Sequence, residues 1–270
     1  MTSEILNYKL SYKFQKKDER DYIYKTLPHP TNAKLQLNIV VRPDTKFLKV
    51  DKSSPSSFQL TKLPPILDQG QLGTCVPNSF SYTISKQTRS TLNISRLMLY
   101  ALCRSIDYTP LDQDDGTTIR SACQSISNYG CCKETIFPYL YYNAFTLPPL
   151  STFKNSNFFK KFTYFFVNQD LISIKSALQT YNTPIIFGFM VYQSFMDSKN
   201  GIIPMPNTKT ENLLGGHCIT IVGYNDSTQM FTCSNNWSAN WGNKGYCYIP
   251  YAYILNTTLA SDFCVTIFSY

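Results

Sequence analysis

The feature that most constrains the fold of this 270-residue chain is a change in hydrophobic periodicity near Pro184. Before it, apolar side chains such as Val76, Phe80 and Ile84 recur at helical spacing. After it, the apolar residues gather in short runs rich in β-branched and aromatic side chains, which are typical of strands. Helices are therefore expected first and strands second. This order favours an α+β fold whose two halves meet at an active site.

Three segments ahead of Pro184 carry helix signals. The expected helices begin at Cys75, at Ile119 and at Leu171. Pro77 falls in the first turn of the first helix, where its missing N–H costs nothing. Gly130 is placed to cap the end of the second helix, and Asp170 to cap the start of the third.

The strand signals lie in four runs, at residues 185–192, 218–224, 230–237 and 245–251. The two middle runs, separated by turn-forming residues, predict a β-hairpin. If its loop is residues 225–227, Tyr224 pairs with Thr228 and His217 falls opposite Asn235. This register predicts a hydrogen bond between the histidine and the asparagine. A one-residue slip would instead pair His217 with Asn236 and turn the histidine to the other face of the sheet.

Composition along the chain predicts three regions. Residues 1–62 are polar and contain several prolines, which is typical of an arm followed by a linker. Residues 63–157 are expected to form a mainly helical lobe, and residues 158–270 a mainly β lobe. We expect the arm to dock against the folded body.

The distribution of charged and apolar residues argues against nucleic-acid and membrane partners. The net charge of +8 is scattered along the chain rather than gathered in a basic stripe, so no nucleic-acid partner is expected. No apolar run reaches the roughly 18 residues of a membrane span, and the first residues lack a signal-peptide core. These features predict a cytoplasmic protein, in a host cytoplasm or a virion if it is viral, without a membrane partner.

Metal and cofactor sites are not expected either. The sequence has nine cysteines, which in a reducing compartment are thiols rather than disulfides. The only histidines are His29 and His217, and Cys131 and Cys132 are adjacent rather than spaced as zinc ligands. No motif in the chain predicts a cofactor.

A candidate nucleophilic site combines residues from both expected halves. Cys75 stands at the start of a helix, where the free N–H groups and the helix dipole favour a thiolate. His217 is the only histidine outside the polar arm and is therefore the candidate base. Asn235 is the candidate partner that orients the imidazole and fixes its tautomer.

These residues resemble the papain-like cysteine peptidases. Gln69 stands six residues before Cys75 in the glycine-containing stretch LDQGQLGTC, as in that family. The segment NNWSANWGNKGY, which begins at Asn235, is similar to the family's Asn-Ser-Trp-Gly, Trp-Gly and Gly-Tyr run. Other stretches look like a bacterial and large-virus branch that is similar to xylellain. The resemblance covers roughly residues 64–253.

The resemblance implies a two-lobed fold with the cleft between a helical lobe and a β-barrel-like lobe. It implies that Cys75 is the nucleophile, His217 the acid and base, Asn235 its orienting partner, and Gln69 an oxyanion donor. The same resemblance places three substrate-binding residues, Gly116, Gly216 and Trp237. The implied activity is that of an endopeptidase acting on polypeptides without a cofactor.

The chain departs from the family pattern at four positions: Leu72, Val76, Asn236 and Ser238. None of these departures removes a group that moves protons, so they concern the shape of the cleft more than the chemistry. Two other classes of protein stay open. One is a catalytically silent papain-like binding module, and the other is a Cys/His acyl-transfer enzyme of the transglutaminase kind.

Overall fold

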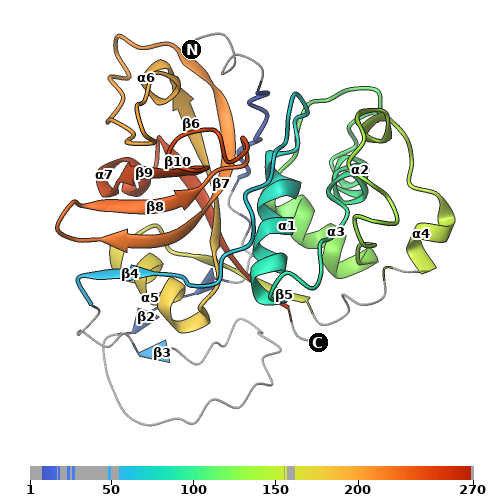
Figure 1. Ribbon diagram of the computed structural model, residues 1–270, viewed down its shortest axis with the longest axis horizontal. Helices are drawn as coiled ribbons and strands as arrows, with labels where there is room; N and C mark the ends of the chain where they lie inside the picture. The colour runs from blue at the N-terminus through green and yellow to red at the C-terminus, as the bar shows by residue number, and fades with distance from the viewer. Residues whose placement is uncertain are drawn as a thin grey trace.

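The structure is a computed structural model. It describes residues 8–16, 18, 55–154, 156 and 162–268, together with the backbone of three short strands at 23–24, 26–27 and 48–49. Helices α1–α4 lie on one side of the molecule and the strands of a large sheet on the other, with α1 at the junction (Figure 1). His29 lies outside the described residues. No helix in the described part is long and apolar enough to cross a membrane.

The helices occupy these residues: α1 Cys75–Gln87, α2 Arg96–Ile106, α3 Ile119–Tyr129, η2 Tyr141–Phe145, α4 Leu150–Lys154, α5 Leu171–Tyr181, α6 Gln193–Met196 and α7 Tyr251–Leu255. All three predicted helices are present, with the predicted caps. Asp170 accepts a hydrogen bond from the Ser173 N–H at 2.8 Å at the start of α5. Gly130 ends α3 with a φ of 70°, a conformation that favours glycine.

The strands are β1 Ile23–Tyr24, β2 Thr26–Leu27, β3 Leu48–Lys49, β4 Ser57–Gln59, β5 Phe162–Val167, β6 Ile185–Tyr192, β7 Leu213–Asn225, β8 Met230–Ser234, β9 Tyr246–Pro250 and β10 Ala260–Phe268. The main sheet has the order β1-β5-β10-β6-β7-β8-β9, and β4 pairs with β7. Residues 57–59, which the sequence analysis assigned to a linker, therefore belong to the sheet.

The predicted hairpin between β7 and β8 is present, but its predicted register is wrong. Tyr224 pairs with Phe231 rather than with Thr228, and Thr220 pairs with Ser234. The turn is longer than expected because it takes in residues 226–229, with Gln229 in the left-handed region at a φ of 56°. The pairing also shifts between Ile221 and Gly223, as in a β-bulge.

Two hydrophobic cores lie on the two sides of the junction. One contains the aromatic and aliphatic side chains between the sheet and α5–α7, with Phe187, Phe189 and Trp237 fully buried. The other joins α1–α3 and contains most of the cysteines. All nine cysteines are buried free thiols. The papain-like α+β arrangement expected from the sequence is therefore present.

Candidate active site

The imidazole of His217 is held on β7 by a side chain that follows β8. Its Nε2 lies 2.8 Å from Oδ1 of Asn235. The same oxygen accepts the backbone N–H of Asn236 at 2.8 Å, so the amide oxygen faces the ring and Nε2 carries the proton. The lone pair of the neutral ring is then on Nδ1, a buried atom that has no hydrogen-bond partner among the described residues.

Trp237 covers this hydrogen-bonded pair. Its ring stacks on that of His217, with centroids 4.6 Å apart and planes 26° apart, and it is completely buried. Phe189 of β6 meets the imidazole edge-on at a centroid distance of 5.7 Å. These rings exclude water from the hydrogen bond between His217 and Asn235, which strengthens it.

Cys75 is the first residue of α1 and lies against the strand that carries His217. Burial raises the pKa of the Cys75 thiol, and the backbone of Cys218, the residue after His217, and of Val76 offsets part of this rise. The side chain of Asn236 ties the two elements together. Its Nδ2 donates to the carbonyl oxygens of Cys75 at 3.2 Å and of Cys218 at 3.0 Å.

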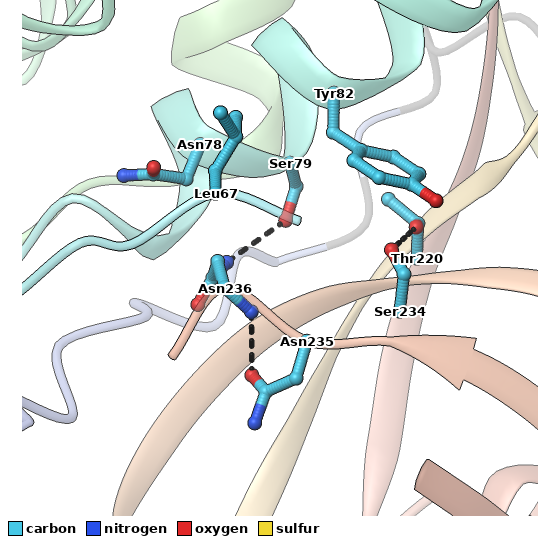
Figure 2. A pocket seen from close by; sticks show the side chains of 8 residues that line it. All are labelled: Leu67, Asn78, Ser79, Tyr82, Thr220, Ser234, Asn235 and Asn236. Carbon is cyan, nitrogen blue, oxygen red and sulfur yellow. Dashed lines mark hydrogen bonds between the residues drawn. The ribbon is translucent and has the colours of Figure 1, made fainter. Parts of the chain in front are cut away.

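The small pocket shown in Figure 2 lies between α1, the middle of β7 and the end of β8. Asn236 stands between Asn235 and Ser79 of α1 in this view, and Thr220 bonds to Ser234 across the two strands. Cys75 and His217 do not line this pocket. It therefore adjoins the candidate site and is separate from the region where a substrate would react.

Gln69 reaches the site from the segment that precedes α1. Its backbone N–H donates to the carbonyl of Asn236 at 2.9 Å, and Asp68 forms a β-bridge with Trp237. The side-chain amide of Gln69 is fully buried and donates to the carbonyls of Leu72 and Lys9, both at 2.9 Å. The predicted oxyanion donor is therefore bonded to the N-terminal segment.

Residues 8–16 are the described part of the N-terminal arm that the sequence predicts, and they cross the site in an extended conformation. From here on, the arm means residues 8–16. The Tyr12 N–H donates to the carbonyl of Gly216 at 3.0 Å, and the Lys13 N–H donates to the carbonyl of Thr117 at 3.2 Å. The arm therefore bonds to β7 on one side and to the segment before α3 on the other.

Ser11 occupies the position over Cys75. Burial raises the pKa of the Cys75 thiol, and the nearby backbone and hydroxyl of Ser11 offset this rise only in part. A Cβ added to Gly116 would lie 1.7 Å from the carbonyl oxygen of Ser11, and one added to Gly73 would lie 2.7 Å from its hydroxyl. The two glycines therefore give the arm room to approach the nucleophile's helix.

Side chains hold the arm at both ends. Tyr8 stacks on Trp237 with centroids 5.1 Å apart, and its hydroxyl donates to the Trp237 carbonyl at 3.0 Å. Lys9 pairs with Asp114 at 3.1 Å. At the other end, the Arg120 N–H donates to the side chain of Gln15 at 2.8 Å. Together with the arm, the fold leaves Cys75 only 1% exposed and His217 fully buried.

Burial sets the charge state of this closed site. It raises the pKa of Cys75 to about 11 and lowers the pKa of His217 to about 4, even though the hydrogen bond to Asn235 raises it. Both groups are therefore neutral near pH 7. The thiolate–imidazolium pair that the resemblance implies is not the resting charge state while the arm is in place.

The structure brings together most of the predicted site residues, with one change of role. Gly116 lies against the arm, but its N–H donates to the hydroxyl of Tyr100 at 3.0 Å rather than to the extended segment. The strand-like bond on this side comes from the carbonyl of Thr117 instead. Gly216 and Trp237 also contact the arm, and their role in substrate binding stays a prediction.

Three residues of the site were missed by the sequence analysis: Ser11, Tyr12 and Asn236. The arm carried a signal, because in YKLSYKF at residues 8–14 aromatic or aliphatic side chains alternate with polar ones. Such alternation is typical of an extended segment with one face in contact with the protein. The sequence indicates Asn236 as a departure from the family pattern and as the residue opposite His217 in a slipped register, but not as a link between the two elements.

Comparison with known families agrees with this geometry. A family model described as papain family cysteine protease matches residues 50–265. The chain belongs to the papain family of cysteine proteases. A peptidase C1-like protein of Acanthamoeba polyphaga mimivirus is 30% identical over 285 aligned positions, covering 97% of this chain and 88% of that protein. Membership makes this chain a thiol protease, a peptide hydrolase of a family that acts on polypeptides.

Solved structures of the family share the fold. The crystal structure of xylellain, a cysteine protease from Xylella fastidiosa, superposes with a TM-score of 0.77 at 28% identity, covering 96% of this chain and all of that one. A procathepsin B from Trypanosoma congolense superposes with a TM-score of 0.60 at 20% identity, covering 82% of this chain and 80% of that one. The second likeness shows the fold alone.

Proposed function

We propose that this protein is an endopeptidase in which Cys75, His217 and Asn235 cleave peptide bonds through an acyl-enzyme. The observation that carries the proposal is the bond from His217 Nε2 to Asn235, which leaves Nδ1 as the free base of a ring next to the strand residue that contacts the Cys75 thiol. An oriented base and a thiol at a helix start are the parts that covalent peptide hydrolysis requires.

The proposed reaction begins with transfer of the thiol proton from Cys75 to Nδ1 of His217. The thiolate attacks the scissile carbonyl, and the resulting oxyanion accepts hydrogen bonds from the Gln69 amide and the Cys75 N–H. The imidazolium then protonates the leaving amine, and the C–N bond breaks to leave a thioester on Cys75. Water, deprotonated by His217, hydrolyses the thioester and restores the thiol.

We also propose that the arm holds the enzyme inactive until it leaves the cleft. In support, the Lys9 carbonyl takes the hydrogen bond of the Gln69 amide, and Ser11 covers Cys75. Arm contact also contributes to the burial that keeps both catalytic groups neutral. Departure of the arm would expose the thiol to water, lower its pKa and free the donor for a substrate oxyanion.

Endopeptidase activity is the expected form, because the only histidine in the described part of the chain is His217. None is therefore left in the folded body to hold a C-terminal carboxylate. The silent-module and transglutaminase-like alternatives are not favoured by any residue in the site. They predict different products, since the first gives no turnover and the second incorporates amines without hydrolysis.

The test uses an arm-displaced variant, defined as the full chain carrying Tyr8→Ala and Tyr12→Ala. These changes remove the stacking on Trp237 and the side chain of Tyr12, which is 4% exposed and is the one buried residue among residues 8–16. Hydrolysis of casein, with products identified by mass, should appear in this variant and disappear when Cys75→Ala is added. The matched control replaces two exposed tyrosines, Tyr108→Ala and Tyr141→Ala, and should stay as inactive as the intact protein.

A folded arm-displaced variant without hydrolysis would overturn the proposed function. Amine incorporation into casein without peptide release would point to the acyl-transfer alternative instead.

A further inference from the structure

The two oxyanion donors of the proposed reaction lie at opposite ends of one short loop, residues 69–74. The Gln69 side chain is at its start, and the Cys75 N–H follows directly after its end. No residue of this loop belongs to a helix or a strand. Its internal backbone bonds run from the Leu72 N–H to the Gln69 carbonyl at 3.3 Å and from the Thr74 N–H to the Leu72 carbonyl at 2.8 Å. Contacts from other segments must therefore help to fix the distance between the two donors.

The end of the loop is fixed by the helix that carries the nucleophile. Thr74 is the N-cap residue of α1, and its carbonyl accepts the Asn78 N–H at 3.0 Å. The side-chain amide of Asn78 donates to the same carbonyl at 2.8 Å. The helix therefore sets the direction of the Cys75 N–H, which is one of the free N–H groups of its first turn.

The start of the loop has no such support from a helix. One proton of the Gln69 amide is donated to the Leu72 carbonyl within the loop, and the other is donated to the Lys9 carbonyl of the arm. The second proton is the one that becomes available when the arm leaves. Because the first bond lies inside the loop, the shape of the loop determines where the second proton points.

Tyr139 joins the two ends of the loop through its hydroxyl group. The hydroxyl donates to the Gln69 carbonyl at 2.9 Å, and it is also hydrogen-bonded to the hydroxyl of Thr74. A phenol has one proton, so Thr74 is the donor of the second bond. Burial raises the pKa of Tyr139 to about 12, which keeps the phenol proton in place near pH 7. One oxygen atom therefore links Gln69 to the residue that precedes Cys75.

The ring of Tyr139 is itself held by an ion pair. The guanidinium of Arg96 lies over the ring, 3.7 Å from its centroid, and donates to Glu134 at 2.7 and 3.0 Å. Arg96 also donates to the Asp68 carbonyl at 3.0 Å and to the side-chain oxygen of Asn78 at 2.8 Å. The network therefore bonds both the residue just before the loop and the first turn of α1, the same two parts that Tyr139 connects.

We propose that Tyr139 is a positioning residue, which holds the Gln69 amide at the distance and angle from the Cys75 N–H that a substrate oxyanion requires. The proposal rests on the proposed peptidase function and deepens it. Tyr139 acts through the backbone of Gln69, so it needs no contact with the substrate. Without its hydroxyl, the Gln69 carbonyl keeps only the 3.3 Å bond from Leu72. A displaced donor slows the step in which the oxyanion forms and leaves the binding of the substrate unchanged.

The test compares the arm-displaced variant with and without Tyr139→Phe. The substrate is a peptide that spans a casein cleavage site and carries a fluorophore and a quencher. We expect kcat to fall by about tenfold and KM to stay within about twofold, because the oxyanion forms only during the reaction. Iodoacetamide labelling of Cys75 should stay within about twofold, since alkylation needs the thiolate but forms no oxyanion. A general loss of structure would change the labelling rate and kcat together.

A double-mutant cycle assigns the loss to the Gln69 amide. When Gln69→Ala is already present, adding Tyr139→Phe should change kcat by less than about twofold, because the donor that Tyr139 positions is gone. The matched control is Tyr142→Phe, which removes the hydroxyl of a tyrosine that is 64% exposed. It should leave kcat, KM and the labelling rate unchanged.

Thr74→Val gives a second measurement of the same link. It removes the hydroxyl that donates to Tyr139 and costs no cap, because the Thr74 side chain makes no capping hydrogen bond to α1. We expect kcat to fall by about three- to tenfold, and the loss should not add to that of Tyr139→Phe, which already breaks this link.

The outcomes separate the inference from the proposed function. An unchanged kcat in Tyr139→Phe would overturn the inference, as would a loss that is just as large in the Gln69→Ala background. Both results would leave the proposed function standing. Absence of hydrolysis in the arm-displaced variant with Tyr139 intact would overturn the proposed function, and the inference with it. Melting temperature identifies a Tyr139→Phe variant that has failed to fold, and the kcat of Thr74→Val then decides the inference.

Discussion

Cys75 and two cysteines of the helical core, Cys103 and Cys123, are all buried, but different parts of the chain bury them. Cys103 and Cys123 lie in the core between α2 and α3, where the fold itself excludes water. Cys75 is just as inaccessible, but the residue over it is Ser11 of the arm. Burial raises the pKa of Cys103 to about 12 and that of Cys75 to about 11. Departure of the arm would therefore expose Cys75 to solvent but leave Cys103 and Cys123 buried, because only Cys75 is buried by a separate extended segment.

The largest expected effect separates these cysteines by activity. In the arm-displaced variant, Cys75→Ala should lower peptide hydrolysis by at least about 10⁴-fold, because no other group forms the thioester. Cys103→Ala should leave kcat/KM unchanged while lowering the free energy of unfolding by about 1–3 kcal/mol. Steady-state kinetics and urea denaturation measure the two quantities. A Cys75→Ala variant that retains hydrolysis would show that the thiol is not the nucleophile.

The second-largest expected effect concerns the side-chain amide of Gln69, which donates a hydrogen bond to the arm in the intact protein. Gln69→Ala in the arm-displaced variant should lower kcat by about 10²–10³-fold, the usual loss for one oxyanion donor. The change should fall mainly on kcat, since the bond strengthens as the oxyanion forms. Gln113→Ala, at an exposed glutamine, is the control. A purely positional role for Gln69 would instead raise KM with kcat unaltered.

The pH dependence of stability sharpens the comparison further. The pKa of His217 is about 4 in the folded protein, below the ordinary value of 6.5, so the unfolded chain takes up this proton first as the pH falls. Neutral His217 therefore contributes about 3 kcal/mol to the free energy of unfolding above pH 6.5. This contribution should be lost as the pH falls from 6.5 toward 4.

Asp262 opposes this trend near the acidic end, because burial raises its pKa and a protonated carboxyl favours the folded state there. Urea denaturation at several pH values should show the loss in the intact protein and a smaller one in His217→Gln. Equal slopes in the two proteins would contradict the assignment of the lowered pKa to His217.

The smallest effect concerns the ion pair at one end of the arm. Lys9 lies 3.1 Å from Asp114, but its side chain is 42% exposed, so solvent screens the pair and it contributes about 0–1 kcal/mol. Lys9→Ala in the otherwise intact chain should therefore raise residual hydrolysis by no more than about fivefold. Lys209→Ala, at an exposed loop lysine, should have no effect. A rise as large as that in the arm-displaced variant would mean that this ion pair, rather than Tyr8 and Tyr12, holds the arm.

Sequence reasoning reached the parts of the fold that local chemistry determines. The helix at Cys75, the cap at Asp170 and the glycine at position 130 were all predictable, because each depends on residues close in sequence. The contact between His217 and Asn235 was also confirmed, although the register used to predict it was wrong. A four-residue turn and a bulge change the pairing in ways that hydrophobic alternation does not report.

The parts that sequence reasoning missed depend on distant contacts. Tyr12 and Asp262, whose side chains are hydrogen-bonded, are 250 residues apart, and neither lies in a motif. The closed state of Cys75 also has no local signal, since its raised pKa comes from burial beneath residues far along the chain. The domain boundaries and the cytoplasmic location stay predictions.

The most direct test of the central claim is the rate at which iodoacetamide labels Cys75 between pH 5 and 9, mapped by mass in the intact protein and in the arm-displaced variant. Thiolate fraction governs this rate. In the intact protein Cys75 should label as slowly as Cys103. In the arm-displaced variant it should label rapidly well below pH 8.5, about a hundredfold faster or more, and His217→Ala should abolish the gain. Rapid labelling of Cys75 in the intact protein, or slow labelling once the arm is displaced, would contradict an arm-sealed Cys–His site.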